Sequence, residues 1–250
     1  MTIQELEKKA RQIRRDTLEE IHIAKSGHTG GSLSAIDLMV GIYYGKMRVD
    51  PQNPQWEDRD RFVLSKAHAI PALYPILADL GFFPREELKT LRKLHSNLQG
   101  HPDRKKTPGL DTSSGSLGQG LSLAVGMAIG ARLRHKDIQV YAIMGDGESQ
   151  EGQIWEASMA AAHYKLDNLT AIWDHNHLQI DGNNNDVMSL GDIEAKLRAF
   201  GYHVIVIDGN DMKQVMAALN EDPCGKPKAI LAETRKGKGV SFMENQIGWH

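Results

Sequence analysis

The sequence predicts an α/β fold in which helices cover both faces of a doubly wound, mostly parallel sheet. Several short runs are apolar on both sides, as strands buried on both faces are. Segments with helical periodicity separate these runs, which is the order expected for βαβ units. With 250 residues, 40% hydrophobic and 25% charged, the chain is long enough to bury one full core without disulfides. We therefore expect a single domain over residues 1–250, with a helical segment at its N-terminus.

The elements follow one another from a helical start. Apolar residues recur at helical spacing from Ile3 to Ile21, and this helix should end before Ser26-Gly27. A second helix fits residues 32–47. The remaining apolar runs and helical patterns predict strands at 61–65, 138–144, 169–174, 202–208 and 228–234, and helices at 117–134, 154–163, 193–200 and 212–220.

Charge and cysteine content exclude several classes of protein. The 30 basic and 32 acidic residues give a net charge of −2, so nothing in the overall charge favours nucleic acid or an anionic membrane as a partner. Cys224 is the one cysteine and cannot form an internal disulfide. The polar N-terminus is unlike a signal peptide, and no run approaches the ~18 apolar residues of a membrane span. We expect a cytoplasmic protein.

Two polar segments follow neighbouring buried runs. Gly145-Asp146-Gly147 comes directly after the run 138–144, and Asn176 follows the run 169–174. Each alone is typical of an ordinary turn or cap. Ligands of open parallel sheets bind beyond the carboxyl ends of the strands, and carboxylate and amide oxygens suit Mg²⁺. Together the two segments predict a site for a divalent cation and a diphosphate.

The spacing of these segments resembles the thiamine diphosphate motif, in which GDG is followed by a short polar segment that ends in Asn. The resemblance implies that the side chains of Asp146 and Asn176 and the backbone carbonyl of Leu178 bind the metal, and that Gly147 lies against the diphosphate. The implied cofactors are thiamine diphosphate and Mg²⁺, with Ca²⁺ or Mn²⁺ as possible substitutes. The motif commonly ends in Asn-Asn, whereas this chain has His175-Asn176.

Further segments, in the right order along essentially all of the chain, resemble the transketolase family. They are Ser26-Gly27-His28, Ser65-Lys66-Ala67-His68, Gly100-His101-Pro102, Gly115-Ser116-Leu117-Gly118-Gln119-Gly120, Lys236-Gly237-Lys238-Gly239 and Trp249-His250. Two positions depart from the family pattern. Thr29 stands where proline is usual, and Ala67 stands where glycine is usual before His68, which puts donor preference in doubt more than cofactor binding.

The resemblance assigns a role to each of these segments. It places His28, His101 and His250 in the substrate channel as catalytic residues, and it places His68, Gly115, Leu117 and Lys236 against the cofactor. Other interpretations remain open. A histidine in a predicted loop is more often a surface residue, the glycines would also serve close helix packing, and the KGKG segment would also suit a solvated loop.

The family transfers a two-carbon ketol unit from a ketose phosphate to an aldose phosphate, within the pentose phosphate pathway. In this family the thiamine chemistry needs a glutamate from a pyrimidine-binding domain, and we expect residues 1–250 not to include that domain. We therefore expect the N-terminal subunit of a split transketolase, active with a separate C-terminal subunit in a dimer of heterodimers (a heterotetramer), or a fragment of a longer enzyme. The alternatives are a related transferase with an unusual ketose donor, a 1-deoxyxylulose-phosphate synthase-like enzyme, and a non-catalytic cofactor-binding module.

Overall fold

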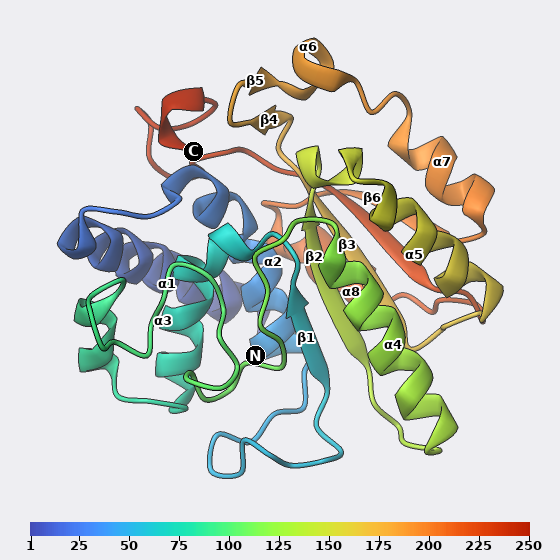
Figure 1. Cartoon of the computed structure of the whole chain (residues 1–250), viewed down its shortest axis with the longest axis horizontal. Coiled ribbons are helices and arrows are strands. Elements are labelled where there is room, and N and C mark those ends of the chain that lie inside the picture. The colour runs from blue at the N-terminus through green and yellow to red at the C-terminus, as the bar shows by residue number, and fades with distance from the viewer.

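The computed structural model describes all 250 residues and has a parallel sheet between two layers of helices (Figure 1). The strands are β1 (Arg61–Leu64), β2 (Val140–Gly145), β3 (Leu169–His175), β6 (His203–Asp208) and β7 (Lys228–Glu233). They pair in parallel in the order β1-β2-β3-β7-β6. Each strand lies within two residues of its predicted bounds, and the predicted doubly wound α/β class is confirmed.

Different helices cover the two faces of the sheet. The first face packs against α1 (Ile3–Ala24), α2 (Thr29–Gly45), α3 (Ile70–Leu80) and α8 (Met212–Asn220). The second packs against α4 (Gln119–Leu133), α5 (Gly152–His163) and α7 (Ile193–Phe200). In Figure 1 these layers lie to either side of the strands.

Successive side chains along each strand belong alternately to the two apolar cores. In β2, Tyr141 and Ile143 join the core on the α1 and α2 side, whereas Val140 and Ala142 join the core on the α4 and α5 side. Successive side chains of a strand point to opposite faces. A strand with a core on each face must therefore be apolar throughout, which is why these runs could be recognised.

The sequence did not predict the helix α3. It contains Pro71 in its first turn, where the missing N–H removes no helical hydrogen bond, and Pro75 further along. A short antiparallel pair, β4 (Leu178–Gln179) with β5 (Gly182–Asn183), and the helix α6 (Asn184–Met188) were also not predicted. His68 lies in a 3₁₀ helix, Ala67–Ala69, so the expectation of a loop there was wrong. None of the helices combines the length and apolar composition needed to cross a bilayer.

Candidate active site

A cleft of about 370 Å³ opens at the carboxyl end of the sheet. Its lining includes every residue that the sequence proposed for the site, although these come from segments spread over the whole chain. The predicted residues that line it are His28, His68, His101, Gly115, Leu117, Asp146, Gly147, Asn176, Leu178, Lys236 and His250. The structure thus brings the predicted site residues together, and the role of each stays a prediction.

The loops after β2 and β3 are joined by hydrogen bonds. These strands are neighbours, so Asp146 and Asn176 lie at the same edge. The Asp146 carboxylate accepts hydrogen bonds from the backbone N–H groups of Gly147, at 2.8 Å, and of His177. Asn176 Oδ1 accepts from the backbone N–H of Leu178 at 3.1 Å. The three predicted metal ligands therefore belong to one connected turn structure.

Asp146 has the environment of a cation ligand. Its side chain is almost fully buried, and it forms no ion pair within the chain. Burial and the neighbouring Asp174 raise its pKa. A buried carboxylate without a counter-charge is costly. Together with the Asn176 amide oxygen and the Leu178 carbonyl it forms an all-oxygen donor set, which hard divalent cations prefer. These residues fit the implied metal and would hold it.

Below the cleft lies a buried ion pair that was not predicted from the sequence. Lys66 Nζ donates to the Asp174 carboxylate and, at 2.9 Å, to the Gly31 carbonyl. The hydroxyls of Ser34 and Thr234 also donate to Asp174. This cluster connects the ends of β1, β3 and β7 with the start of α2. The available signal for this pair in the sequence was that Lys66 and Asp174 lie at the ends of two apolar runs.

Lys236 reaches the cleft from the segment after β7. Its Nζ donates to His250 Nδ1 at 2.8 Å and lies 3.5 Å from the Leu178 carbonyl oxygen. Burial and the charge of Lys66 lower the pKa of Lys236 to about 8. Burial, followed by the charge of Lys236, lowers the pKa of His250 to about 4. The ammonium is thus placed where it would offset the charge of an anionic ligand.

Three imidazoles gather beside Lys236. The ring centroids of His28, His68 and His250 lie 5.2 to 5.3 Å from one another. Burial is the largest cause that lowers the pKa of His28 and of His68, and nearby cations add to it. Burial and Arg92 also lower the pKa of His101, the fourth predicted histidine. At neutral pH these rings are uncharged, so each can donate and accept a hydrogen bond with a sugar hydroxyl or carbonyl.

Glu148 fixes the glycine-rich loop that carries Gly115 and Leu117. Its buried carboxylate accepts from the backbone N–H groups of Gly118 at 2.8 Å and Gly145 at 3.0 Å, and from the Ser65 hydroxyl. Gly118 has φ +86°, which other residues rarely adopt. A role for Glu148 was not predicted, although its position three residues past the end of β2 was an available signal.

Gly120 is needed for close packing of a helix against the sheet. A Cβ atom there would lie 2.3 Å from Ser65 Oγ, so only glycine allows α4 to approach the end of β1 this closely. The packing interpretation therefore applies to Gly120, while contact of Gly115 and Leu117 with the cofactor stays a prediction. Of the two departures from the family pattern, Thr29 is the buried first residue of α2 and Ala67 is fully buried with a negative φ. The backbone at Ala67 does not require glycine.

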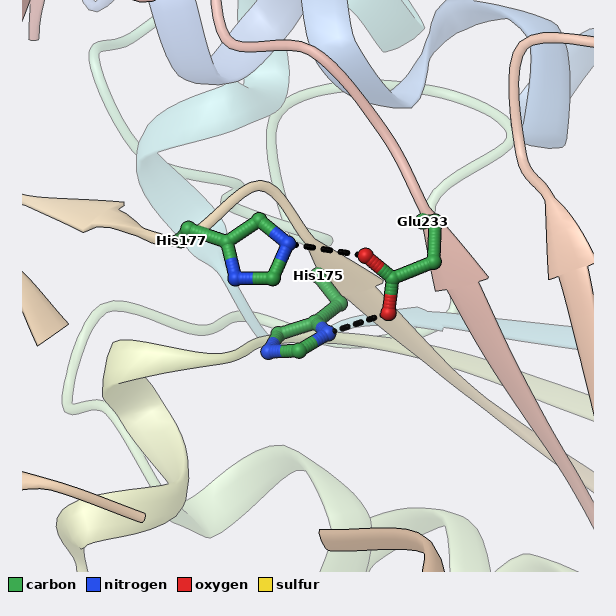
Figure 2. Close-up of side chains that lie close together, drawn as sticks. All are labelled: His175, His177 and Glu233. Carbon is green, nitrogen blue, oxygen red and sulfur yellow. Dashed lines mark hydrogen bonds and ion pairs between the residues drawn. The ribbon is translucent and has the colours of Figure 1, made fainter. Parts of the chain in front are cut away.

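A second histidine cluster, shown in Figure 2, lies beside the cleft. His175 Nδ1 and His177 Nε2 each contact one carboxylate oxygen of Glu233, at 2.7 and 2.8 Å. Although burial opposes it, the hydrogen bond to Glu233 raises the pKa of His175. No functional role for His177 or Glu233 was predicted from the sequence. The available signal was the two-residue spacing of the histidines at the end of a buried run.

Comparisons with known proteins agree with this geometry. Residues 6–250 match the family model described as transketolase, thiamine diphosphate binding domain. The chain is 47% identical to the 6-deoxy-6-sulfo-D-fructose transketolase subunit SqwG of Clostridium sp. (strain MSTE9), over 98% of this chain and 90% of that protein. It is 42% identical to an apulose-4-phosphate transketolase subunit from Phocaeicola vulgatus, over 100% of this chain and 89% of that protein.

A solved transketolase has the same fold. The structure from Campylobacter jejuni superposes with a TM-score of 0.93 at 34% identity, over 100% of this chain. This chain spans 40% of the length of that one, so it corresponds to one part of the larger enzyme. From the fold, the cleft and these matches we conclude that the chain belongs to the transketolase family and corresponds to its thiamine diphosphate binding domain.

Proposed function

We propose that this chain is the N-terminal, diphosphate-binding subunit of a split transketolase. With a separate C-terminal subunit it would transfer a two-carbon ketol unit from a ketose phosphate to an aldose phosphate. The observation that carries the proposal is the gathering of an oxygen donor set, a buried lysine and four histidines in one cleft. Relatives of nearly the same length that are named as transketolase subunits support the need for a partner.

In this proposal each group in the cleft has a distinct task. Thiamine diphosphate, when bound, supplies the carbanion chemistry of ketol transfer. Asp146, Asn176 and the Leu178 carbonyl hold the Mg²⁺ that binds its diphosphate, and Gly147 leaves room for close approach of the phosphate. Ca²⁺ and Mn²⁺ would substitute, because both accept oxygen ligands. Lys236 offsets the remaining negative charge.

The histidines act on the sugar. His28, His101 and His250 are held neutral by burial and by nearby cations. Neutral imidazoles hydrogen-bond the hydroxyls and carbonyl of the ketose and exchange protons with them. His28 Nδ1 is buried without a partner in the chain, which suits a group that completes its hydrogen bonds with a ligand. His68, Gly115 and Leu117 lie against the cofactor.

The chain's place in an assembly follows from the family architecture. The pyrimidine-binding domain, with its glutamate, would come from the partner subunit, and two such pairs would form a dimer of heterodimers. The whole would act in the cytoplasm on sugar phosphates, as in the pentose phosphate pathway. The names of the relatives favour an unusual ketose as donor, since one of them is a transketolase for 6-deoxy-6-sulfo-D-fructose and another for apulose 4-phosphate.

Reconstitution tests the proposal. The chain alone, the partner alone and their mixture would be assayed for ketol transfer with thiamine diphosphate, Mg²⁺ and a panel of ketoses that includes sulfonated and branched ones. We expect transfer from the mixture only. Full activity of the chain alone would refute the proposal of a split enzyme. Assembly with the partner without transfer from any ketose would favour the non-catalytic module instead.

Cofactor binding is tested separately from activity. Calorimetry with thiamine diphosphate and Mg²⁺ on the assembled subunits should show that Asp146→Asn weakens binding by at least about 10-fold, because the metal loses a charged ligand. Asp181→Asn is the matched control, since Asp181 also lines the cleft but is outside the donor set. Equal losses in both variants would contradict the assignment of Asp146.

A further inference from the structure

The cluster of His175, His177 and Glu233 has the composition of a transition-metal site. Its three potential ligand atoms lie within 4.8 Å of one another. Two imidazole nitrogens and one carboxylate oxygen are typical ligands of Zn²⁺, which holds its ligands at about 2.0 to 2.2 Å. The oxygen-rich set around Asp146 instead suits a hard cation. The two donor sets therefore select different metals.

The fold determines the arrangement of the three side chains. His175 and Glu233 are direct partners in the register of β3 and β7. Both point to the face of the sheet that carries Trp173 and Leu231, two residues earlier in each strand, because strand side chains alternate. Two residues along the chain, His177 returns to the same carboxylate from a backbone with φ +65°. Figure 2 shows both rings directed at the two oxygens of Glu233.

The cluster is accessible as well as ordered. His175 is mostly buried, with 18% of its side chain exposed, while His177 and Glu233 are exposed by 47% and 43%. His175 and Glu233 are thus held by the sheet, and His177 and Glu233 face solvent. The imidazole ring centroids are 4.0 Å apart, so modest rotations would turn the two hydrogen bonds into metal bonds. Three protein ligands leave a fourth tetrahedral position for water.

We propose that His175, His177 and Glu233 bind a divalent transition metal, Zn²⁺, at a site separate from the hard-cation site at Asp146, Asn176 and Leu178. The two sites share one loop, because His175 and His177 flank Asn176 in the sequence. Zn²⁺ bound there would fix the loop that presents Asn176. Binding to the folded chain would then raise its melting temperature.

Co²⁺ provides the direct probe, since a tetrahedral complex absorbs visible light far more strongly than an octahedral one. The metal-free full chain would be titrated with Co²⁺ in excess Mg²⁺, which occupies oxygen-ligand sites. We expect one equivalent of a tetrahedral spectrum, its displacement by Zn²⁺, and a higher melting temperature with Zn²⁺. His177→Gln and Glu233→Gln should each weaken binding by at least about 10-fold, because each removes a ligand.

His203→Gln is the matched control. His203 also pairs with a glutamate, Glu221, at 2.7 Å, but without a second imidazole, so this variant should bind Co²⁺ as the parent does. Absence of a tetrahedral spectrum would overturn the proposal. Binding of Co²⁺ that is unchanged in both His177→Gln and Glu233→Gln would also overturn it. Loss of binding in His68→Gln would do the same, because that result would place the metal among the imidazoles of the cleft.

Discussion

Two histidine clusters lie at the same edge of this sheet, and their neighbours drive their protonation in opposite directions. Inside the cleft, burial and nearby cations lower the pKa values of His28, His68 and His250. Beside the cleft, the contact with Glu233 raises the pKa of His175. Histidine is thus a neutral hydrogen-bonding group in the cleft. Beside the cleft, the environment of His175 stabilises a bound proton, or a metal ion in place of that proton.

The alternation of β3 separates the two environments. Asp174 points toward α2, where it pairs with Lys66, whereas His175 points to the opposite face. Consecutive residues therefore belong to different electrostatic surroundings. For this fold, residue type alone says little about the charge of a histidine, because burial and the neighbouring lysines or glutamate together set its pKa.

The largest expected effect comes from removing the cation beneath the cleft. Lys66→Met leaves Asp174 buried without its partner, which should cost about 3 to 5 kcal/mol of unfolding free energy. Urea denaturation measures the loss. Lys93→Met, at an exposed lysine, is the control and should change stability little. A loss for Lys66→Met below about 1 kcal/mol would mean that the pair behaves like a surface salt bridge.

Removing the second lysine should shift one histidine toward its ordinary behaviour. In Lys236→Met the pKa of His250 should rise from about 4 toward the ordinary histidine value of 6.5. It should stop short of 6.5, because burial is the larger cause of the shift. NMR titration of the imidazole signals measures this. An unchanged pKa of His250 would assign the whole shift to burial.

The neutral histidines should make the fold sensitive to acid. The pKa of His68 is lowered in the folded chain. Its contribution to the free energy of unfolding is therefore fully present above 6.5, the pKa in the unfolded chain, and is lost as the pH falls below that value. Each such group adds a slope of up to about 1.4 kcal/mol per pH unit. Urea denaturation at several pH values should give a smaller slope below about pH 6.5 for His68→Gln than for the parent. His135→Gln, at an exposed position, should keep the parental slope.

The smallest effect is expected at the second cluster, and its sign is opposite. The raised pKa of His175 contributes stability that is present below pH 6.5 and is lost as the pH rises through the folded pKa. Glu233→Gln should therefore cost more at about pH 6 than at about pH 8, by less than about 1 kcal/mol because Glu233 is partly exposed. Denaturation in metal-free buffer at both pH values measures the difference. A larger cost at the higher pH would contradict the comparison.

Much of this fold was visible in the sequence, because strands with a core on each face appear as unbroken apolar runs. The expected neighbourhood of Asp146 and Asn176 followed from the parallel order of their strands. The helix α3 was not predicted, because Pro71 and Pro75 argue against a helix in the sequence although the structure accommodates both. Roles for Lys66, Asp174 and Glu148 were not predicted, because the contact of Lys66 with Asp174 spans 108 residues and that of Glu148 with Ser65 spans 83. Their positions after apolar runs do not by themselves identify partners that distant.

The strand order also has a consequence for how the cleft comes into being. β7 lies between β3 and β6, although it is the last of the five strands in the chain. It must therefore enter a gap between two strands that a ribosome releases earlier. Lys236 and His250 follow it, and His250 meets His28 from the opposite end of the sequence. Contacts of such long range form slowly, so during synthesis the apolar layers should assemble first, and binding competence should appear as the final step of folding.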